Sequence, residues 1–166
     1  VGVGEGIDDL RPFAARESAA VDYDSATRAP AKACAALRTR PSAEVALKMA
    51  FQYWQQCEQR RPNKTKFLAF QNAYHGDTLG SVSVGGVARF PEMFRPLLFD
   101  VIRLPAPDTY RLPPEVNRET TCKFYLAQVE QVIAEYHQEL AAVVIEPLVQ
   151  AAAGMLMHPP GFLAGV

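Results

Sequence analysis

The stretch AAVVIEP, residues 141–147, decides the fold class of this 166-residue chain. Its first five residues form an uninterrupted apolar run, which is typical of a parallel β-strand covered on both faces. A second apolar run, KFLAF at residues 66–70, is bounded by turn-forming residues and predicts another buried strand. We expect a further strand at residues 100–104. Short apolar strands of this kind favour a parallel sheet.

Amphipathic patterns separate these strands. Ser42 can cap a helix that runs through residues 43–61, and Pro62-Asn63 stops it. A second long helix is expected from Thr121, or from the threonine before it, to about residue 140. Helices that alternate with short apolar strands predict βαβ units. The expected fold is therefore α/β, with three layers in the order α/β/α, of which this chain supplies a part.

The composition is that of an ordinary globular protein, with 49% hydrophobic and 21% charged residues. The formal net charge of -1 gives no indication of nucleic acid or an anionic membrane as a partner. The three cysteines are scattered without CxxC spacing and the three histidines lie far apart, so neither a disulfide framework nor a metal site is predicted. No apolar run reaches the roughly 20 residues that cross a bilayer. A cytoplasmic protein is expected.

Residues 1–41 differ in composition from the rest of the chain. They are rich in Ala, Arg, Gly and Asp, with few large aliphatic side chains and no sustained period. Their Gly2-x-Gly4-x-Gly6 spacing matches neither of the common nucleotide-binding glycine motifs, and no predicted strand precedes it. We therefore expect residues 1–41 to be a disordered terminal segment, and residues 42–166 to belong to the folded domain.

Polar side chains follow two of the expected strands. The sequence NAYHGDT, residues 72–78, follows the first strand, and Glu146 and Gln150 follow the last. In open α/β sheets ligands bind outside the carboxyl ends of the strands, so both clusters would share one binding edge. A flat aromatic side chain such as Tyr74 can stack on a planar ligand. The residues alone leave this interpretation and a simple strand-ending turn equally open.

Four motifs carry a resemblance to a known family. They are EVALKMAFQYW (residues 44–54), KFLAFQNAYHGDTLGSVSVGG (66–86), FRPLLF (94–99) and AAVVIEPLVQAAAGMLMHPPGFL (141–163). From residue 43 to residue 166 the chain resembles the large domain of the class III, fold-type I pyridoxal-phosphate aminotransferases. The resemblance implies a partial three-layer domain of that type, with pyridoxal 5'-phosphate as its cofactor.

The resemblance also implies roles for individual residues. Tyr74 would stack on the pyridine ring of the cofactor, and His75 and Gly76 would shape the loop beside it. Glu146 would lie near the cofactor at the strand end, together with Gln150. In this chemistry the cofactor stabilises the substrate carbanion, and the protein orients the cofactor.

Two departures from the family pattern concern catalysis. The glycine-containing phosphate-binding turn of the family falls at residues 38–42, where this chain has the sequence RTRPS without a glycine. The aspartate that pairs with the pyridinium nitrogen and the Schiff-base lysine are both expected downstream of residue 166. No catalytic residue is therefore assigned within this sequence, and the chain on its own is not expected to transaminate.

Three interpretations of the function stay open. The first is amino transfer from S-adenosylmethionine to an oxo acid in biotin synthesis, and the second is amino transfer involving another ω-amino acid. Both imply a small-molecule amino donor and an oxo acid acceptor, and the resemblance implies a homodimer. The third is a non-catalytic remnant that serves as a folding or dimerisation module.

Overall fold

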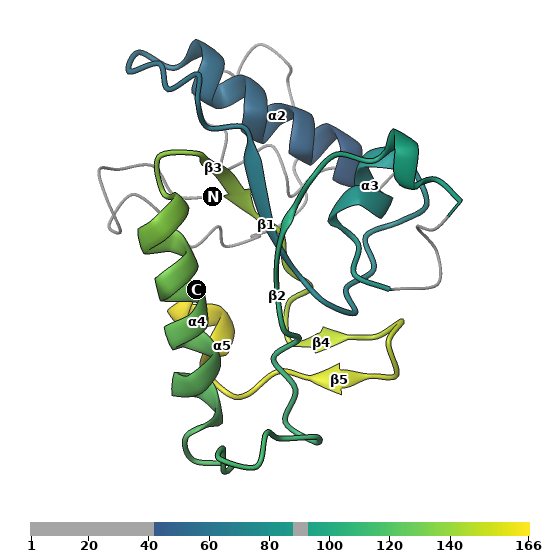
Figure 1. The fold of residues 1–166 in the computed structure, drawn as a ribbon, viewed down its shortest axis with the longest axis vertical. Helices are drawn as coiled ribbons and strands as arrows, with labels where there is room; N and C mark the ends of the chain where they lie inside the picture. Colours follow the sequence, from purple (N-terminus) through teal and green to yellow (C-terminus); the bar gives the residue numbers. More distant parts are fainter. Residues whose placement is uncertain (1–41, 88–92) are drawn as a thin grey trace, which may run out of the picture.

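The fold is built around a parallel β-sheet (Figure 1). The computed structural model describes residues 42–87 and 93–166, so the expectations for residues 1–41 lie outside the described part of the chain. Its elements are, in chain order, α2 (Ser42–Gln56), β1 (Lys66–Phe70), α3 (Leu79–Val84), η3 (Arg95–Leu97), β2 (Ile102–Leu104), α4 (Thr121–Tyr136), β3 (Leu140–Val143), β4 (Val149–Gln150), β5 (Leu156–Met157) and α5 (Phe162–Gly165). In the described part, β1 pairs in parallel with β2 and with β3, in the order β2-β1-β3. The predicted parallel sheet is confirmed.

Helices cover both faces of this sheet. Phe67 and Ala69 of β1 pack against α2 on one face, in a core that includes the fully buried Trp54. Leu68 and Phe70 pack against α4 and α5 on the opposite face. Side chains of a strand alternate between the two faces of a sheet, which explains why this short run is buried along its whole length. The predicted three-layer α/β/α order is confirmed.

α2 is shorter than the sequence predicts. It ends at Gln56, so the expected continuation to residue 61 is wrong. The chain folds back after the helix, because the Arg61 N–H donates to the carbonyl oxygen of Trp54 at 2.9 Å. The ammonium group of Lys64 then lies 4.2 Å from the centre of the Trp54 ring, whose Nε1 donates to the carbonyl oxygen of Ala141. These contacts around Trp54 favour a turn over further helix.

The other predicted boundaries also move by a few residues. β2 begins at Ile102 and not at residue 100, and β3 covers Leu140–Val143 in place of residues 141–145. α4 ends at Tyr136 because the chain must turn before β3 begins. Residues 149–157 form a two-stranded antiparallel hairpin, β4–β5, that the sequence does not predict. Strands of two residues are too short to show an alternating pattern.

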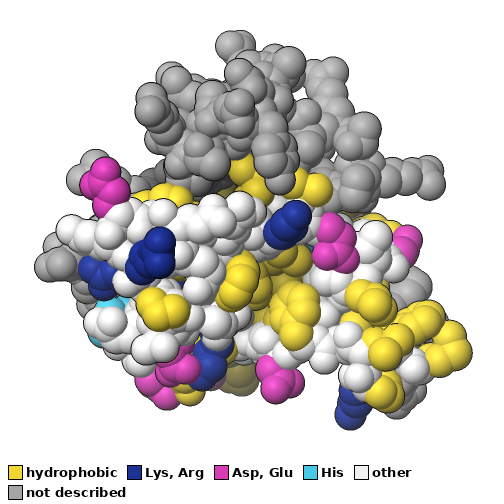
Figure 2. All heavy atoms as spheres, turned by 90° about the horizontal axis from the view of Figure 1, so that it is seen from above, with side chains coloured by type: hydrophobic (Ala, Val, Ile, Leu, Met, Phe, Trp, Pro, Cys, Tyr) yellow, Lys and Arg dark blue, Asp and Glu magenta, His cyan; other side chains and the backbone are white. Residues whose placement is uncertain are grey.

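Large apolar side chains lie exposed on the surface. Figure 2 shows hydrophobic side chains among charges of both signs on the face seen from above. In the described residues the most exposed large apolar side chains are Tyr110, Met93, Leu148, Leu97 and Met155. Exposed side chains of this kind, when they gather, mark surfaces that another part of a protein covers. Within residues 42–87 and 93–166, none of the helices combines the length and the apolar character that a membrane span requires.

Candidate functional site

The two polar clusters meet at the carboxyl edge of the sheet, as the sequence predicts. The Tyr74 N–H, in the loop after β1, donates to Glu146 Oε1 at 2.8 Å. Glu146, which follows β3, accepts a second hydrogen bond at its other oxygen from the Ala151 N–H at 3.2 Å. Hydrogen bonds to a carboxylate are stronger than those between neutral groups. One carboxylate therefore ties the loop after β1 to the chain that continues from β3 through β4.

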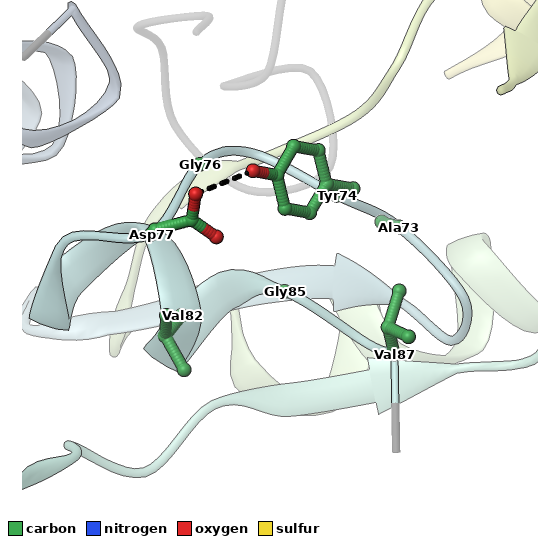
Figure 3. Close-up of a pocket in the computed structure, with 7 residues that line it drawn as sticks. All are labelled: Ala73, Tyr74, Gly76, Asp77, Val82, Gly85 and Val87. Atoms are coloured by element: carbon green, nitrogen blue, oxygen red, sulfur yellow. Dashed lines mark hydrogen bonds between the residues drawn. The ribbon is translucent and has the colours of Figure 1, made fainter. Parts of the chain in front are cut away.

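Tyr74 presents an aromatic ring at this edge. The residue is 38% exposed, and its hydroxyl donates to Asp77 Oδ2 at 2.8 Å. Figure 3 shows the hydroxyl turned toward Asp77 above a small pocket. Besides Tyr74, the residues that line this pocket are Ala73, Gly76, Asp77, Val82, Gly85 and Val87.

The loop that carries Tyr74 closes on itself. The Asn72 N–H donates to the carbonyl oxygen of Gly86 at 3.0 Å, and the Gly86 N–H donates to that of Ala73 at 2.8 Å. A Cβ atom at Gly86 would lie 2.5 Å from the Asn72 nitrogen, so only glycine fits there. Gly76 has a φ of 119°, a left-handed conformation that glycine adopts without strain. Both glycines are required for the path of this loop.

Two histidines lie within electrostatic reach of the same carboxylate. Burial lowers the pKa of His75 and of His158 below the ordinary value of 6.5, and the negative charge of Glu146 offsets part of this effect. Nε2 of His75 and both ring nitrogens of His158 are buried without a hydrogen-bond partner among the described residues. The sequence predicts His75 at this edge. It offers no signal for His158, because the chain reaches that position only through the β4–β5 hairpin.

Gln150 has a different environment from the one expected. The sequence groups its side chain with Glu146, but Glu146 accepts its hydrogen bond from the backbone of Ala151 instead. Gln150 itself is fully buried in β4, and both polar atoms of its amide lack a partner in the described part of the chain. Gln150 therefore precedes the residue that bonds Glu146, but its own amide makes no hydrogen bond to that carboxylate in the described residues.

The described residues fit the ring of a planar cofactor. Tyr74 offers an exposed aromatic ring beside a pocket, and the unpaired polar atoms of His75 and His158 lie within electrostatic reach of Glu146. In residues 42–87 and 93–166 there is no group of three or more side chains that could hold a metal ion. Residues 38–41, where the resemblance places the phosphate turn, lie outside the described part.

These features define an α/β protein with a candidate ligand site at the carboxyl ends of parallel strands. A family model described as aminotransferase class-III matches residues 40–166. The chain belongs to this family, as its motifs predict.

Relatives and solved structures support the assignment. The adenosylmethionine-8-amino-7-oxononanoate aminotransferase of Nitratidesulfovibrio vulgaris is 50% identical over 123 residues, which cover 74% of this chain and 23% of the relative. An amine transaminase from an uncultivated Pseudomonas species, solved in a PLP-bound form, is 34% identical with a TM-score of 0.67, covering 74% of this chain and 28% of that protein. An (S)-enantioselective omega-transaminase from Thermomicrobium roseum is 32% identical with a TM-score of 0.65, covering 74% and 27%. The chain spans about a quarter of the length of these proteins.

Proposed function

We propose that this chain forms the part of a pyridoxal-phosphate aminotransferase that holds the ring of the cofactor, and that the full-length protein transfers an amino group. The observation that carries the proposal is the hydrogen bond from the Tyr74 N–H to Glu146, which joins the two segments expected to bind the cofactor. Membership of the class-III aminotransferase family supports the same conclusion.

The residues at the edge have separate tasks in this proposal. The Tyr74 ring stacks on the cofactor, and its hydroxyl bond to Asp77 restrains the ring. Glu146 holds the backbone of the loop, and the left-handed turn at Gly76 brings the chain close to the cofactor. His75 adds no positive charge near neutral pH, because burial lowers its pKa. When bound, the cofactor supplies the electron sink for a substrate carbanion.

The lysine that holds the cofactor covalently is proposed to lie outside residues 1–166. Lys64 precedes β1 and Lys66 begins it, so both lie at the end of the sheet opposite Tyr74. Lys66 also forms an ion pair with Glu139 at 2.7 Å. Borohydride reduction of the loaded full-length protein, followed by peptide mapping, tests this part of the proposal. A cofactor attached to any lysine of residues 1–166 would overturn it.

The proposed reaction is the transfer of the amino group of S-adenosylmethionine to 8-amino-7-oxononanoate, which gives 7,8-diaminononanoate in biotin synthesis. It is supported by the name of the relative that is 50% identical to this chain. A second candidate is amino transfer involving another ω-amino acid. That candidate is supported by the likeness to the omega-transaminase of Thermomicrobium roseum, at 32% identity.

The full-length protein is further proposed to be a cytoplasmic homodimer. Large apolar side chains that lie exposed in the described residues, among them Met93, Leu97 and Leu148, support a surface that another subunit or another part of the protein covers. Light scattering of the full-length protein measures its mass. The mass of a single chain at micromolar concentration would contradict the dimer.

The amino-transfer proposal is tested by absorbance and by mass spectrometry. Titration of the full-length protein with pyridoxal phosphate should shift the cofactor's visible absorbance and saturate at one cofactor per chain. S-adenosylmethionine with 8-amino-7-oxononanoate should then give the diamino product, and an ω-amino acid such as β-alanine should serve as donor at a much lower rate. Product formed with β-alanine as the amino donor, and not with S-adenosylmethionine, would favour the second candidate. No saturable cofactor binding would overturn both.

A further inference from the structure

α3 connects the Tyr74 loop to the Gly85-Gly86 segment, and it is too short to be stable alone. It contains six residues, whereas isolated helices of fewer than roughly 12 residues are marginal in water. Thr78 precedes the helix but makes no capping hydrogen bond with its side chain. The orientation of α3 must therefore come from contacts with other elements.

At the N-terminal end of α3, the contact comes from α2. Glu44 lies in the first turn of α2, and its Oε1 accepts a hydrogen bond from the Gly80 N–H at 2.6 Å. A Cβ atom at Gly80 would lie 2.8 Å from the Glu44 Cδ, so the carboxylate would have to move if this position carried a side chain. A negative charge at this end complements the dipole of the helix.

At the C-terminal end, the contact comes from β2. Nη2 of Arg103 donates to the carbonyl oxygens of Ser83 and Gly85, the latter at 2.9 Å. These are among the last carbonyl groups of α3 and its cap, which have no partner within the helix. A positive charge at this end also complements the helix dipole. Glu44 and Arg103 thus bind α3 at opposite ends with the favourable sign of charge.

Both contacts lie close to the groups that restrain Tyr74. Gly86 follows the carbonyl that Arg103 binds, and the Gly86 N–H donates to Ala73, the residue before Tyr74. At the other end, Glu44 accepts a hydrogen bond from the Gly80 N–H. Asp77, three residues before Gly80, accepts the hydrogen bond of the Tyr74 hydroxyl. Arg103 therefore acts on the backbone next to Tyr74 through the Gly85-Gly86 segment. Glu44 acts on the Tyr74 hydroxyl through the chain between Asp77 and Gly80.

We propose that Glu44 and Arg103 are positioning residues, which clamp α3 at both ends and thereby set the orientation of the Tyr74 ring. Neither residue touches the cofactor in this proposal. The consequence for the cofactor rests on the function proposed above, whereas the clamp itself is a property of the protein without cofactor. The clamp and its effect on cofactor binding are therefore tested by separate measurements.

Hydrogen exchange in the cofactor-free, full-length protein tests the clamp. The reporter is the Gly86 N–H, because it donates to the Ala73 carbonyl oxygen and not to Glu44, and because Arg103 binds the Gly85 carbonyl beside it. Glu44→Ala and Arg103→Met should each speed its exchange at least about tenfold, because each removes a charge-assisted hydrogen bond. Glu44→Gln keeps an acceptor oxygen and should restore most of the protection. Glu44 and Arg103 act on one short helix. The increase in the Gly86 exchange rate in the double variant should therefore be smaller than the product of the increases in the two single variants.

Two controls separate the clamp from general loss of stability. Exchange of the β1 amides in the same samples reports global opening, and these amides should keep their wild-type rates. Glu130→Ala and Arg118→Met remove exposed charges elsewhere and should leave the Gly86 amide unchanged. If β1 exchanges faster in an alanine or methionine variant, the Gly86 rate is compared with the β1 rate of the same sample, and a Gly86 rate that rises only in step with β1 also overturns the clamp. An unchanged Gly86 rate in Glu44→Ala and Arg103→Met overturns the clamp.

Binding of pyridoxal phosphate then tests the effect on Tyr74. The induced circular dichroism of the bound cofactor should fall in Glu44→Ala and Arg103→Met, its dissociation constant should rise several-fold, and Glu44→Gln should restore both. Faster Gly86 exchange with unchanged dichroism and affinity would overturn the positioning role. A wild-type protein that binds no cofactor would overturn the proposed function, and the Gly86 exchange would still decide the clamp.

Discussion

Tyr74 offers two different groups to the site, a ring and a hydroxyl. We expect Tyr74→Ala in the full-length protein to weaken pyridoxal-phosphate binding about tenfold, because ring stacking contributes roughly 1 kcal/mol beyond buried area. Tyr74→Phe keeps the ring and loses the hydroxyl that bonds Asp77, so its dissociation constant for the cofactor should change less than about threefold. Absorbance titration with pyridoxal phosphate measures the dissociation constant of each variant. Equal losses in the two variants would contradict stacking as the role of Tyr74.

Glu146 acts on the backbone, and that effect is measurable without cofactor. Glu146→Ala removes the acceptor of two N–H groups and should lower the free energy of unfolding by about 1–2 kcal/mol. Glu146→Gln keeps one carbonyl oxygen and should lose roughly half as much. Urea denaturation gives these values, with Glu130→Ala on α4 as an exposed control. If Glu146→Ala matches that control, the carboxylate does not hold the loop.

His75 and His158 make stability depend on pH. Burial lowers the pKa of each below 6.5, so in the range below 6.5 the unfolded chain binds protons that the folded chain does not. The free energy of unfolding should therefore fall as the pH drops below 6.5, and level off below the folded pKa values. Replacement of both residues by glutamine should flatten this fall in urea denaturation series. A slope in the double variant equal to that of the wild-type protein would contradict the assignment.

The individual site residues were predictable to different degrees. Tyr74 and Glu146 follow strands that their apolar runs predict, and parallel pairing then brings them to one edge. Gln150 and His158 follow irregular chain, where Leu148 and Met155 have positive φ angles of 69° and 61°. Non-glycine residues rarely adopt this conformation, and no sequence signal marks it. The environments of Gln150 and His158 therefore could not be predicted.

Among the structural elements, the closed loop of residues 72–86 depends most on one glycine. Gly86→Ala would place a Cβ against the backbone of Asn72 and should destabilise the protein by about 2–3 kcal/mol. Gly85→Ala is the matched control, because its Cβ would lie no closer than 3.2 Å to any neighbouring atom, and it should cost less than about 1 kcal/mol. Thermal unfolding compares the two. Similar costs would show that the loop can relax around Gly86.

The predicted elements are accurate in type and less accurate at their ends. The apolar run of β1 predicts its strand to the residue, since both of its faces are buried. The end of α2 is set by contacts between Trp54 and residues 61 and 64, which helix periodicity does not show. The hairpin β4–β5 depends on pairing between two-residue strands. The local sequence pattern predicts an element whose extent is set by burial of its own side chains. It does not predict a boundary or a pairing that is set by contacts with distant residues.

On the scale of the whole molecule, the sheet order brings separate parts of the chain to one edge. β1 is the central strand, so the loop that follows it lies between the chain segments that follow β2 and β3. The sequence predicts this edge from parallel strands alone, and the family resemblance supplies the cofactor. The central claim is that this edge, in the full-length protein, holds the ring of pyridoxal phosphate.

A crystal structure of the full-length protein grown with pyridoxal phosphate tests this claim most directly. The measured quantity is the separation and tilt between the cofactor ring and the Tyr74 ring. We expect the two rings to be stacked with their centres within roughly 4.5–7 Å, with the Tyr74 N–H still bonded to Glu146. Cofactor density away from this edge, or a Tyr74 ring turned away from the cofactor, would contradict the account.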